Sequence, residues 1–498
     1  MDRKRKLYLN TLTSLSYQIV TVICGFILPR LILSHYGSEV NGLVSSIGQF
    51  LGFITLMEMG VGAVVQSSLY EPLAKQDTEA ISAILTSARN FFRKIAFALI
   101  CYVIVLCLVF PYISENNFGW VFTATLIVIL SIGSFTQYVF GIVDRLLLTS
   151  DQKGYIIYGT NIVSIFLNTV ACVIAVQLSA SIHTVKLISA LVFMIAPILI
   201  HIYVCKNYHI NYKMRYDYEP IKQKWNGIAQ HISAVILDGT DMVVLTTFSS
   251  LSNVSIYAVY NLVVKGITSL TLSLTNGVQA LLGEMWAKKE EDSLNNFFGW
   301  VEWAVHTGTV FVFGCCTVLI VPFVSVYTNG VTDANYIAPL FGFLLTMANA
   351  GHCLRLPYNL MILAGGHYKQ TQRCYIIAAA LNLSISIVAV RAFGLIGVTI
   401  GTLIAMAYQT MWMAIYVSKN LIRWPIKKFI RQVLTDFIEF GTAYALTIYI
   451  PMCDCNFIAW VLLAIIDAFI WIVVIVLINK ILYPQYTRQL LVKLSKKF

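Results

Sequence analysis

Charged residues are scarce in this chain of 498 residues. Asp, Glu, Lys and Arg make up 11% of it, whereas a typical soluble domain has about 25%. So few charges could not cover the surface of a soluble protein of this size. Disorder is excluded by the 58% of hydrophobic and 13% of aromatic residues, which would collapse in water. The composition therefore predicts a polytopic membrane protein.

Sequence motifs of enzymes and metal sites are absent as well. The chain has no His-Glu-x-x-His pair, no Gly-x-x-x-x-Gly-Lys-Ser/Thr phosphate loop and no Gly-x-Ser-x-Gly elbow. The 11 cysteines show no paired Cys-x-x-Cys spacing, and we expect most of them to be small buried side chains in helices. These absences argue against ATP hydrolysis and familiar hydrolase chemistry, and we expect no cofactor and no metal.

Long apolar runs are what the sequence has instead. A transmembrane helix needs about 20 apolar residues to cross the hydrocarbon core of a bilayer. Fourteen runs meet this need, and the lack of a two-residue alternation favours helices over a barrel. They lie near 10–33, 40–68, 91–111, 118–142, 155–178, 182–204, 228–248, 254–282, 299–326, 336–364, 374–391, 395–417, 432–450 and 456–480. The sequence predicts an all-α polytopic fold with about 14 transmembrane helices.

The basic residues support this topology. With a cytoplasmic N-terminus, the two termini and every second connection hold all but five of the 34 Lys and Arg residues. Such an excess on cytoplasmic loops is typical of correctly oriented membrane proteins. We therefore expect both termini in the cytoplasm. The net charge of +11 then reflects topology and contact with the lipid bilayer, with no nucleic acid as partner.

The chain also repeats itself at an offset of 213 to 214 residues. Leu-Tyr-Glu-Pro-Leu-Ala-Lys (69–75) matches Leu-Gly-Glu-Met-Trp-Ala-Lys (282–288), and a fainter match aligns Asn168 with Asn382. An even number of helices per repeat gives both halves the same orientation in the membrane, as in transporters built from parallel repeats. We predict two six-helix lobes, 1–212 and 213–420. Two additional transmembrane helices and a basic cytoplasmic tail follow at 421–498.

Basic residues at membrane depth are candidates for binding an anion. A charge there costs about 2.5–3.5 kcal/mol on insertion scales, so it usually faces a cavity or a partner. Lys265 is predicted near the midplane, Arg355 shares a helix face with His352 beside a proline, and Arg30 lies nearer an outer helix end. Together these four side chains would suit a phosphate or diphosphate. The alternatives are a buried ion pair for Lys265 and anchoring at the membrane interface for the two arginines.

Acidic residues form a second deep set. Two aspartates one turn apart on one helix face suit binding of H⁺ or Na⁺, and pairing with a basic residue is the alternative. The candidate ion-coupling or charge-pair residues are Asp238, Asp241, Glu58, Glu302 and His306.

Other acidic and basic residues are predicted at helix ends. At the cytoplasmic mouth we predict a gate formed by Asp144, Arg145, Glu71 and Glu284. In the last two predicted helices, Asp436 and Asp467 have no obvious basic partner at similar depth.

Several stretches resemble a known family. Near the N-terminus lie Phe-Ile-Leu-Pro-Arg-Leu-Ile-Leu (26–33), Tyr-Gly-Ser-Glu-Val-Asn-Gly-Leu (36–43) and Met-Gly-Val-Gly-Ala (59–63), followed by the 69–75 stretch. Leu-Ala-Gly-Gly-His-Tyr-Lys (363–369) comes later. Together they resemble Wzx-type polysaccharide repeat-unit flippases of the multidrug/oligosaccharidyl-lipid/polysaccharide (MOP) exporter superfamily.

This resemblance implies a MATE-like fold in the bacterial cytoplasmic (inner) membrane. It implies translocation of undecaprenyl-diphosphate-linked oligosaccharide repeat units for O-antigen, capsule or exopolysaccharide synthesis, by alternating access coupled to H⁺ or Na⁺. A polysaccharide polymerase and a chain-length regulator are the partners that such a protein implies.

Two other functions stay open. One is a multidrug or cation antiporter of the same fold, which the deep basic residues disfavour. The other is a membrane polysaccharide polymerase or glycosyltransferase, for which the short predicted loops leave no catalytic domain.

Overall fold

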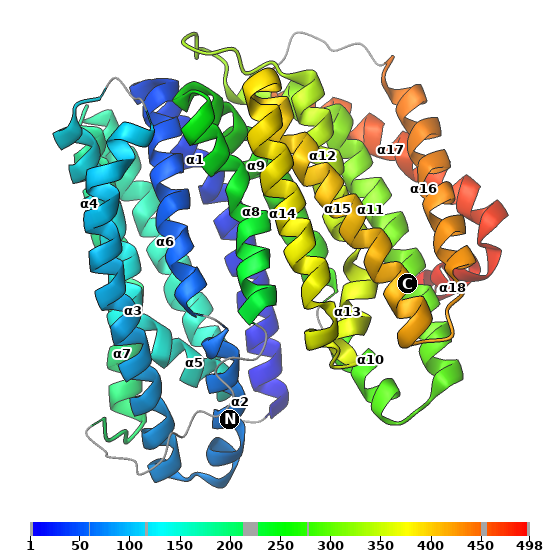
Figure 1. Cartoon of the computed structure of the whole chain (residues 1–498), viewed down its shortest axis with the longest axis horizontal. Helices are drawn as coiled ribbons and strands as arrows, with labels where there is room; N and C mark the ends of the chain where they lie inside the picture. Colours follow the sequence, from blue (N-terminus) through cyan, green and yellow to red (C-terminus); the bar gives the residue numbers. More distant parts are fainter. Residues whose placement is uncertain are drawn as a thin grey trace. The chain divides into compact units, whose positions relative to one another are not determined.

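The computed structural model describes residues 3–58, 60–114, 118–212, 228–275, 278–449 and 456–495. All the regular structure in these residues is helical (Figure 1). The prediction of an all-α polytopic membrane protein is confirmed. Internal contacts divide the chain into two compact units, Met1–Val235 with Ser250–Ser255 (unit 1) and Ile236–Ser249 with Ile256–Phe498 (unit 2). The three-part division at residues 212 and 420 stays a prediction.

The described residues of unit 1 form seven whole α-helices, one 3-10 helix and one π-helix around a large apolar core. Its elements are α1 (Arg3–Gly52), the 3-10 helix η1 (Phe53–Glu58), α2 (Val61–Lys75), α3 (Thr78–Ile113), α4 (Trp120–Thr136), the π-helix η2 (Gln137–Gly141), α5 (Ile142–Ser150), α6 (Gly154–Gln177) and α7 (Ile182–Asn207). α1 packs along α6, α6 along α7, and α4 on both α3 and α7. Buried side chains such as Ile47, Phe92 and Leu147 fill the core between them.

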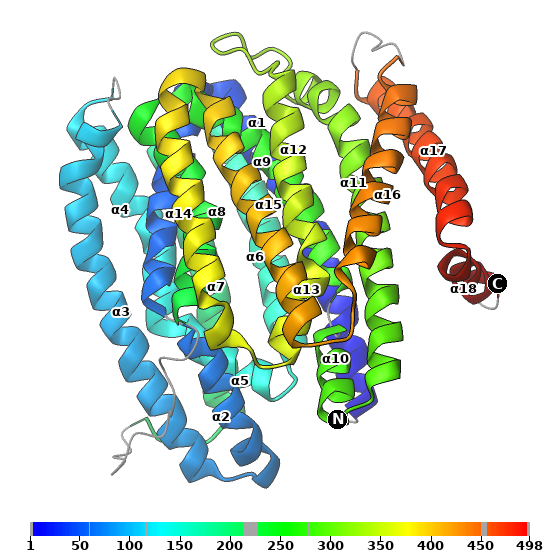
Figure 2. The same cartoon turned by 45° about the vertical axis from the view of Figure 1, so that its right-hand side comes forward.

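Unit 2 holds most of the remaining helices, whereas the first residues of α8 and α9 belong to unit 1. The elements are α8 (Ile228–Phe248), α9 (Leu251–Leu274), α10 (Val278–Ala287), α11 (Glu291–Tyr327), α12 (Pro339–Leu354), α13 (Leu356–Ala364), α14 (Tyr368–Phe393), α15 (Leu395–Asn420), α16 (Ile426–Thr447), α17 (Phe457–Leu482) and α18 (Pro484–Ser495). α14 packs along α15, and α12 lies against α11 and α15. α11 also contacts α16 and α17, which run side by side (Figure 2).

The first turn of α9 belongs to unit 1 because it packs closely on α1. Asn41 donates a hydrogen bond to Ser255 Oγ at 2.7 Å. An added Cβ at Gly42 would lie 1.9 Å from the carbonyl oxygen of Leu251, so a larger residue would separate the two backbones. The absence of a side chain at Gly42 is therefore what permits this contact.

The helix boundaries repeat along the sequence. α3 and α11 begin at Thr78 and Glu291, and α7 and α15 begin at Ile182 and Leu395, so both pairs have the offset of the sequence repeat. Each repeat also has a helix that is broken, by η2 between α4 and α5 and by Arg355 between α12 and α13. The predicted internal repeat is confirmed, with α16 and α17 following it as an additional pair.

Ten helices among the described residues are long and apolar enough to cross a membrane. One of them covers α1 and η1 together, and so contains most of the first two predicted segments. Three predicted segments lie outside these ten spans. They correspond to α8, to the broken pair α12–α13 and to α16.

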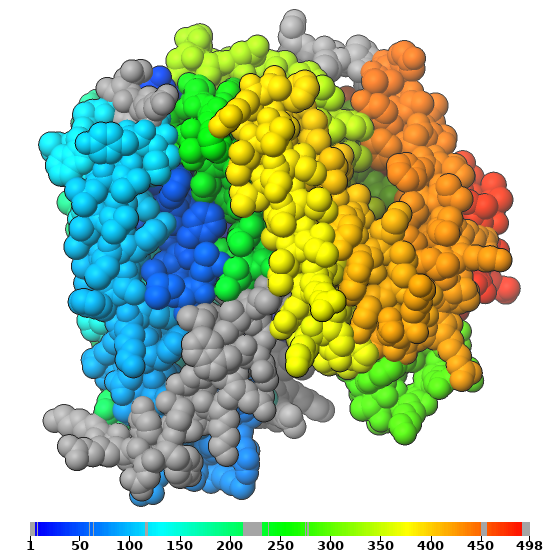
Figure 3. All heavy atoms as spheres, in the orientation of Figure 1, coloured from blue at the N-terminus to red at the C-terminus, as the bar shows by residue number. Residues whose placement is uncertain are grey.

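The side chains of α16 are arranged for a lipid environment. Ile430, Leu434 and Phe437 are exposed, whereas Asp436 and Glu439 are buried. A surface helix of a soluble protein has the opposite arrangement, with its charges in water. Figure 3 shows α16, in orange, at the molecular surface. This apolar exterior is what a multi-pass membrane protein requires.

α1 changes direction at Gly37, between the first two predicted membrane segments. The backbone of Gly37 has φ 84° and ψ 174°, and the chain is helical on both sides of it. Residues with a Cβ are nearly absent from this region of conformational space. Two helices can therefore follow each other here with no connecting loop.

Replacing Gly37 tests this account of the bend. Gly37→Ala is expected to destabilise the protein by about 1–3 kcal/mol, because alanine would retain a strained backbone. The measurement is thermal melting of the purified protein in detergent. Gly25→Ala is the matched control, since an added Cβ at this position of α1 meets nothing within 4 Å. Equal melting temperatures for the two variants would contradict the role of Gly37.

Candidate functional site

Asp241 of α8 is buried among hydrogen-bond partners from three other helices of unit 2. Its side chain is 4% exposed. Oδ2 accepts hydrogen bonds from Thr402 Oγ1 of α15 at 2.7 Å and from Tyr257 Oη of α9 at 3.2 Å. Oδ1 accepts a longer one from Asn382 Nδ2 of α14 at 3.5 Å. Four helices thus meet at one carboxylate.

More oxygen atoms contact the hydrogen-bond partners of this carboxylate. Asn382 Oδ1 accepts a hydrogen bond from Thr240 at 2.6 Å, and Asn382 Nδ2 donates to Thr402 at 2.9 Å. The carbonyl oxygen of Val398 lies 3.1 Å from Thr402 Oγ1. Carboxylate, amide, hydroxyl and carbonyl oxygens are the ligands that hard cations prefer. The arrangement is chemically suited to a small monovalent cation, and the carboxylate is equally able to take up a proton.

The carboxylate of this cluster belongs to the second repeat alone. The two repeats share their helix packing here, since the thiol of Cys172 faces the carbonyl of Val185 at 3.8 Å and the hydroxyl of Ser386 faces that of Val398 at 3.3 Å. At the repeat offset from Asp241, however, the first repeat has Leu28, which packs in an apolar cluster with Cys172. The scaffold is repeated and the acidic group is not.

Lys265 and Asp238 are the two candidate residues that the sequence places near Asp241. Lys265 of α9 is half-buried and within electrostatic reach of Asp241, and its pairing with a carboxylate stays a prediction. The side chain of Asp238 lies outside the part of the chain that the structure describes.

Arg355 lies at the break between α12 and α13. Its side chain is 8% exposed, so anchoring at a membrane interface does not describe it. The guanidinium donates to Gln409 Oε1 of α15 and contacts His352 Nδ1 at 3.1 Å. The predicted shared face of Arg355 and His352 is thus seen in the structure. Both residues belong to the same unit as Asp241.

Arg30 and Glu58 belong to unit 1. Arg30 is half-buried in α1, next to Pro29 within the same helix. Glu58 ends η1 and accepts a hydrogen bond from Tyr138 Oη of η2 at 2.6 Å. Two departures from α-helical geometry are therefore joined by this bond, and π-helical turns often occur at functional sites.

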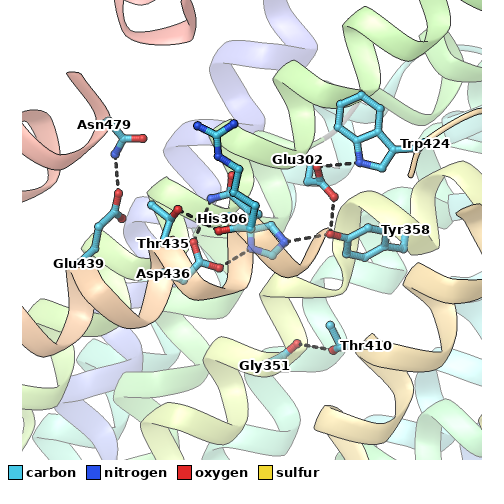
Figure 4. Close-up of polar contacts among 12 residues, drawn as sticks. Glu302, His306, Gly351, Tyr358, Thr410, Trp424, Thr435, Asp436, Glu439 and Asn479 are labelled. Atoms are coloured by element: carbon cyan, nitrogen blue, oxygen red, sulfur yellow. Dashed lines mark hydrogen bonds and ion pairs between the residues drawn. The ribbon is translucent and has the colours of Figure 1, made fainter. Parts of the chain in front are cut away.

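Glu302 and His306 of α11 belong to a buried chain of hydrogen bonds (Figure 4). Glu302 accepts from Tyr358 Oη of α13 at 2.6 Å and from Trp424 Nε1 at 2.9 Å. His306 Nδ1 lies 2.6 Å from Asp436 Oδ2 of α16. The expectation that Asp436 lacks a basic partner is therefore wrong, because depth along the sequence does not show which helices are neighbours.

The predicted gate residues Asp144 and Arg145 do not pair with each other. Asp144 of α5 is 2% exposed, lies 2.6 Å from His201 Nδ1 and accepts from Tyr212 Oη at 3.2 Å. Arg145 donates to Asn161 Oδ1 at 3.2 Å. Asp144 thus joins α5 to α7 and to the segment that follows α7.

Glu71 and Glu284 occupy equivalent places in the two repeats. Each is exposed and pairs with a lysine one turn further along its own helix, Glu71 with Lys75 at 2.6 Å and Glu284 with Lys288 at 2.5 Å. Exposed pairs of this kind contribute little to stability. Their role in a gate stays a prediction.

Asp151, directly after α5, joins three segments of unit 1. It forms ion pairs with Lys6 at 3.2 Å and Lys153 at 2.8 Å, and it accepts a hydrogen bond from Tyr208. Burial acts to raise the pKa of Asp151, but the hydrogen bonds from Lys153 and Tyr208 outweigh it and the pKa is lowered. The carboxylate is thus stabilised in its ionised form.

The lowered pKa of Asp151 predicts a pH-dependent contribution to stability. This contribution is fully present above the ordinary aspartate pKa of about 3.9 and is lost as the pH falls through the lower folded-state value. Asp151→Asn is therefore expected to melt below wild type at pH 7, with a difference that shrinks on acidification towards pH 3. Asp292→Asn, at an exposed position of α11, is the control. A difference that stays constant or grows would contradict this account.

The partners of the buried charges are the functional candidates that sequence reasoning missed. Thr402, Asn382, Tyr257 and Tyr358 are neutral, and a neutral polar residue in an apolar run gives no signal comparable to a charge. The faint repeat match at Asn382 is the one available indication.

Comparison with known proteins shows the fold. No protein-family model matches the sequence, and no curated protein sequence matches it either. Among solved structures, lipid II flippase MurJ in an inward closed conformation aligns over 96% of this chain and 99% of its own, with TM-score 0.67 and 16% identity.

Transporters of the MATE family align over a smaller share of the chain. An inward-facing multidrug resistance MATE transporter of the MOP superfamily covers 82% of this chain and 98% of its own, with TM-score 0.57 and 13% identity. A mutant of the Vibrio cholerae MATE transporter VcmN covers 84% and 96%, with TM-score 0.55 and 12% identity. The chain therefore has the fold that MurJ and the MATE transporters share, and the prediction of a MATE-like fold is confirmed.

Proposed function

We propose that this protein is a Wzx-type flippase that translocates undecaprenyl-diphosphate-linked oligosaccharide repeat units across the bacterial cytoplasmic membrane. The observation that carries the proposal is the likeness to a lipid II flippase over 96% of the chain. The stretches at 26–33, 36–43 and 363–369 support the Wzx type within the superfamily.

The deep basic residues support an anionic substrate. Arg30 in unit 1 and Lys265 in unit 2 are half-buried in helices long enough to cross a membrane. Arg355 in unit 2 is buried at the break between α12 and α13. Guanidinium and ammonium groups in such surroundings bind phosphate oxygens through charge-assisted hydrogen bonds. In this proposal they bind the diphosphate of the lipid carrier, whereas a transporter of cationic drugs would gain nothing from them.

Asp241 is the proposed site of the coupling ion. It is buried, it has oxygen-bearing partners on α9, α14 and α15, and it lies in electrostatic reach of Lys265. Ion binding would change the interaction of the carboxylate with this lysine. The coupling ion and a substrate-binding residue are thereby linked through one electrostatic contact.

Sodium-dependent stability tests the ion site. If Asp241 binds Na⁺, replacing choline with Na⁺ in the buffer should raise the melting temperature of the purified protein. The gain in stability is about 2.7 kcal/mol when the Na⁺ concentration is 100 times the dissociation constant. Asp241→Asn should abolish this increase and Thr402→Val should reduce it. Thr399→Val is the control, because that hydroxyl donates to backbone carbonyls of its own helix.

A proton as coupling ion gives a different result. Melting would then be indifferent to Na⁺, and its pH dependence would differ between wild type and Asp241→Asn. If neither Na⁺ nor pH distinguishes wild type from this variant, Asp241 is not the ion site.

Genetic complementation tests the function itself. Deleting the gene in its native host is expected to abolish surface polysaccharide while lipid-linked repeat units accumulate. Lys265→Ala and Arg355→Ala should restore polysaccharide about tenfold less well than wild type at equal membrane levels, equivalent to losing about 1.4 kcal/mol of interaction. Lys419→Ala, at an exposed position at the end of α15, is the control and should complement fully.

Other outcomes would overturn parts of the proposal. Full complementation by both variants would contradict the role of the basic residues. Loss of drug resistance with normal polysaccharide would favour the multidrug or cation antiporter, the function named by the MATE structures.

A further inference from the structure

A second cluster of buried acids lies where α16 packs against α11. Glu302, Asp436 and Glu439 are 3%, 6% and 0% exposed. His306, fully buried, is the basic group that hydrogen-bonds to this cluster (Figure 4). Three ionised carboxylates with one imidazole would leave net negative charge in a medium of low dielectric constant, which is costly. The composition of the cluster therefore favours the uptake of protons.

With both contacts of Tyr358 as hydrogen bonds and His306 Nδ1 donating to Asp436, the cluster holds one proton beyond those of a neutral histidine and an ionised glutamate. Tyr358 Oη lies 2.6 Å from Glu302 Oε1 and 3.4 Å from His306 Nε2, and a hydroxyl has one proton to donate. If Tyr358 donates to Glu302, His306 Nε2 must carry a proton that it donates to Tyr358. If Tyr358 donates to His306, Glu302 must carry the proton instead. The two arrangements hold the same number of protons.

In both arrangements His306 Nδ1 donates to Asp436. Asp436 Oδ2 lies 2.6 Å from this nitrogen, and its other oxygen accepts from Gln432 at 3.0 Å. Asp436 is thus held as an acceptor from both sides. The mobile proton is shared by Glu302, Tyr358 and His306.

Glu439 adds negative charge one turn from Asp436 on α16. Its Oε1 accepts from Asn479 of α17 at 2.6 Å, and Asn479 accepts from Trp303 at 2.6 Å. Its Oε2 is buried and has no hydrogen-bond partner among the described residues. A buried carboxylate oxygen without a donor is costly, so this group also favours positive charge nearby.

A pocket gives water access to Glu302. Its volume is about 280 Å³, and its wall includes Glu302, Lys428, Arg431 and Tyr486. Because a water molecule occupies about 30 Å³ in the liquid, the pocket has room for several. The charged and polar side chains in this wall, among them Lys428, Arg431 and Gln432, make water its expected content.

The remaining charged and titratable groups near the cluster have partners of their own. Lys428 of α16 lies 3.7 Å from the ring centre of Trp424, and Arg431 lies 4.9 Å from that of Tyr483. Arg355, between α12 and α13, contacts Gln409 and His352. Other titratable groups on neighbouring elements include Tyr486 of α18, Cys353 of α12 and, on α17, Asp467, which accepts from Trp471.

We propose that Glu302, Tyr358 and His306, with Asp436 as the fixed acceptor, form a proton-binding site that is loaded from the pocket. A proton from water binds to Glu302. Glu302 passes it to Tyr358 Oη as Tyr358 passes its own hydroxyl proton to His306 Nε2. The product is an imidazolium between two carboxylates with Tyr358 neutral, and release follows the reverse order.

Proton binding at this site acts on the contact between α11 and α16. An imidazolium strengthens the interaction of His306 with Asp436, and so holds the first of the two additional helices to the second repeat. The site goes beyond the proposed function, because it would bind protons whichever substrate is transported and whichever ion Asp241 takes.

Counting protons tests the site directly. The purified full chain is titrated in weakly buffered detergent between pH 4 and pH 10. The neutral variant Glu302→Gln/His306→Gln/Asp436→Asn is expected to bind at least about one proton fewer per chain than wild type. Thr435→Val is the matched control on α16, since its hydroxyl donates to the backbone of Arg431 in the same helix. An equal proton count for wild type and the neutral variant would overturn the proposal.

A milder set of variants covers the case in which the triple variant does not fold. Glu302→Gln and His306→Gln, made separately, each remove one of the two places where the mobile proton resides. At least one of them should show a lower proton count, and unchanged counts in both would overturn the site. These measurements use no substrate, so their result is independent of the flippase proposal.

Loading through the pocket is tested by blocking it. Gln485→Cys, which lies in the pocket wall, is labelled with a bulky maleimide, and wild type treated in the same way is the baseline. Proton uptake after a pH jump should become at least about tenfold slower, without a change in the final count. Lys480→Cys, at an exposed position of α17, is the control. An unchanged rate in labelled Gln485→Cys would overturn loading by this route.

Discussion

The low dielectric constant of the bilayer is the constraint on which this structure depends. In that medium each polar group must find a partner inside the protein, because no water competes for it. α16 shows the result, with Leu434 and Phe437 exposed and Asp436 and Glu439 buried. Asp241 and Glu302 follow the same rule, since each accepts hydrogen bonds from more than one segment of the chain. The deep charges are thus points at which helices are held together.

The internal repeat separates scaffold from chemistry. Helix boundaries recur at the same offset, and the contacts of Cys172 with Val185 and of Ser386 with Val398 recur with them. Asp241 has no acidic counterpart at the equivalent position of the first repeat, which is Leu28. A repeated helix packing needs similar sizes and shapes at its contacts, whereas a site needs one charge in one place. The two repeats were therefore free to differ at the carboxylate.

The two additional helices are more than an extension of the repeat. α16 supplies Asp436 to the imidazole of His306, and α17 supplies Asn479 to Glu439. The segment before α16 supplies Trp424 to Glu302. Glu302 and His306 of the second repeat would be costly to bury alone. The additional helices and the segment before them give these two side chains hydrogen-bond partners. The additional pair thus completes the polar interior of unit 2.

The sequence by itself determined the helical class, the repeat and most of the candidate membrane segments. These features depend on composition and on spacing along the chain, which are local. Only the tertiary structure decided the partners. Asp436 meets His306 from 130 residues away, and Asp241 is held by Thr402 and other neutral residues that an apolar run conceals. Which helices become neighbours depends on packing over the whole unit, and no local pattern encodes it.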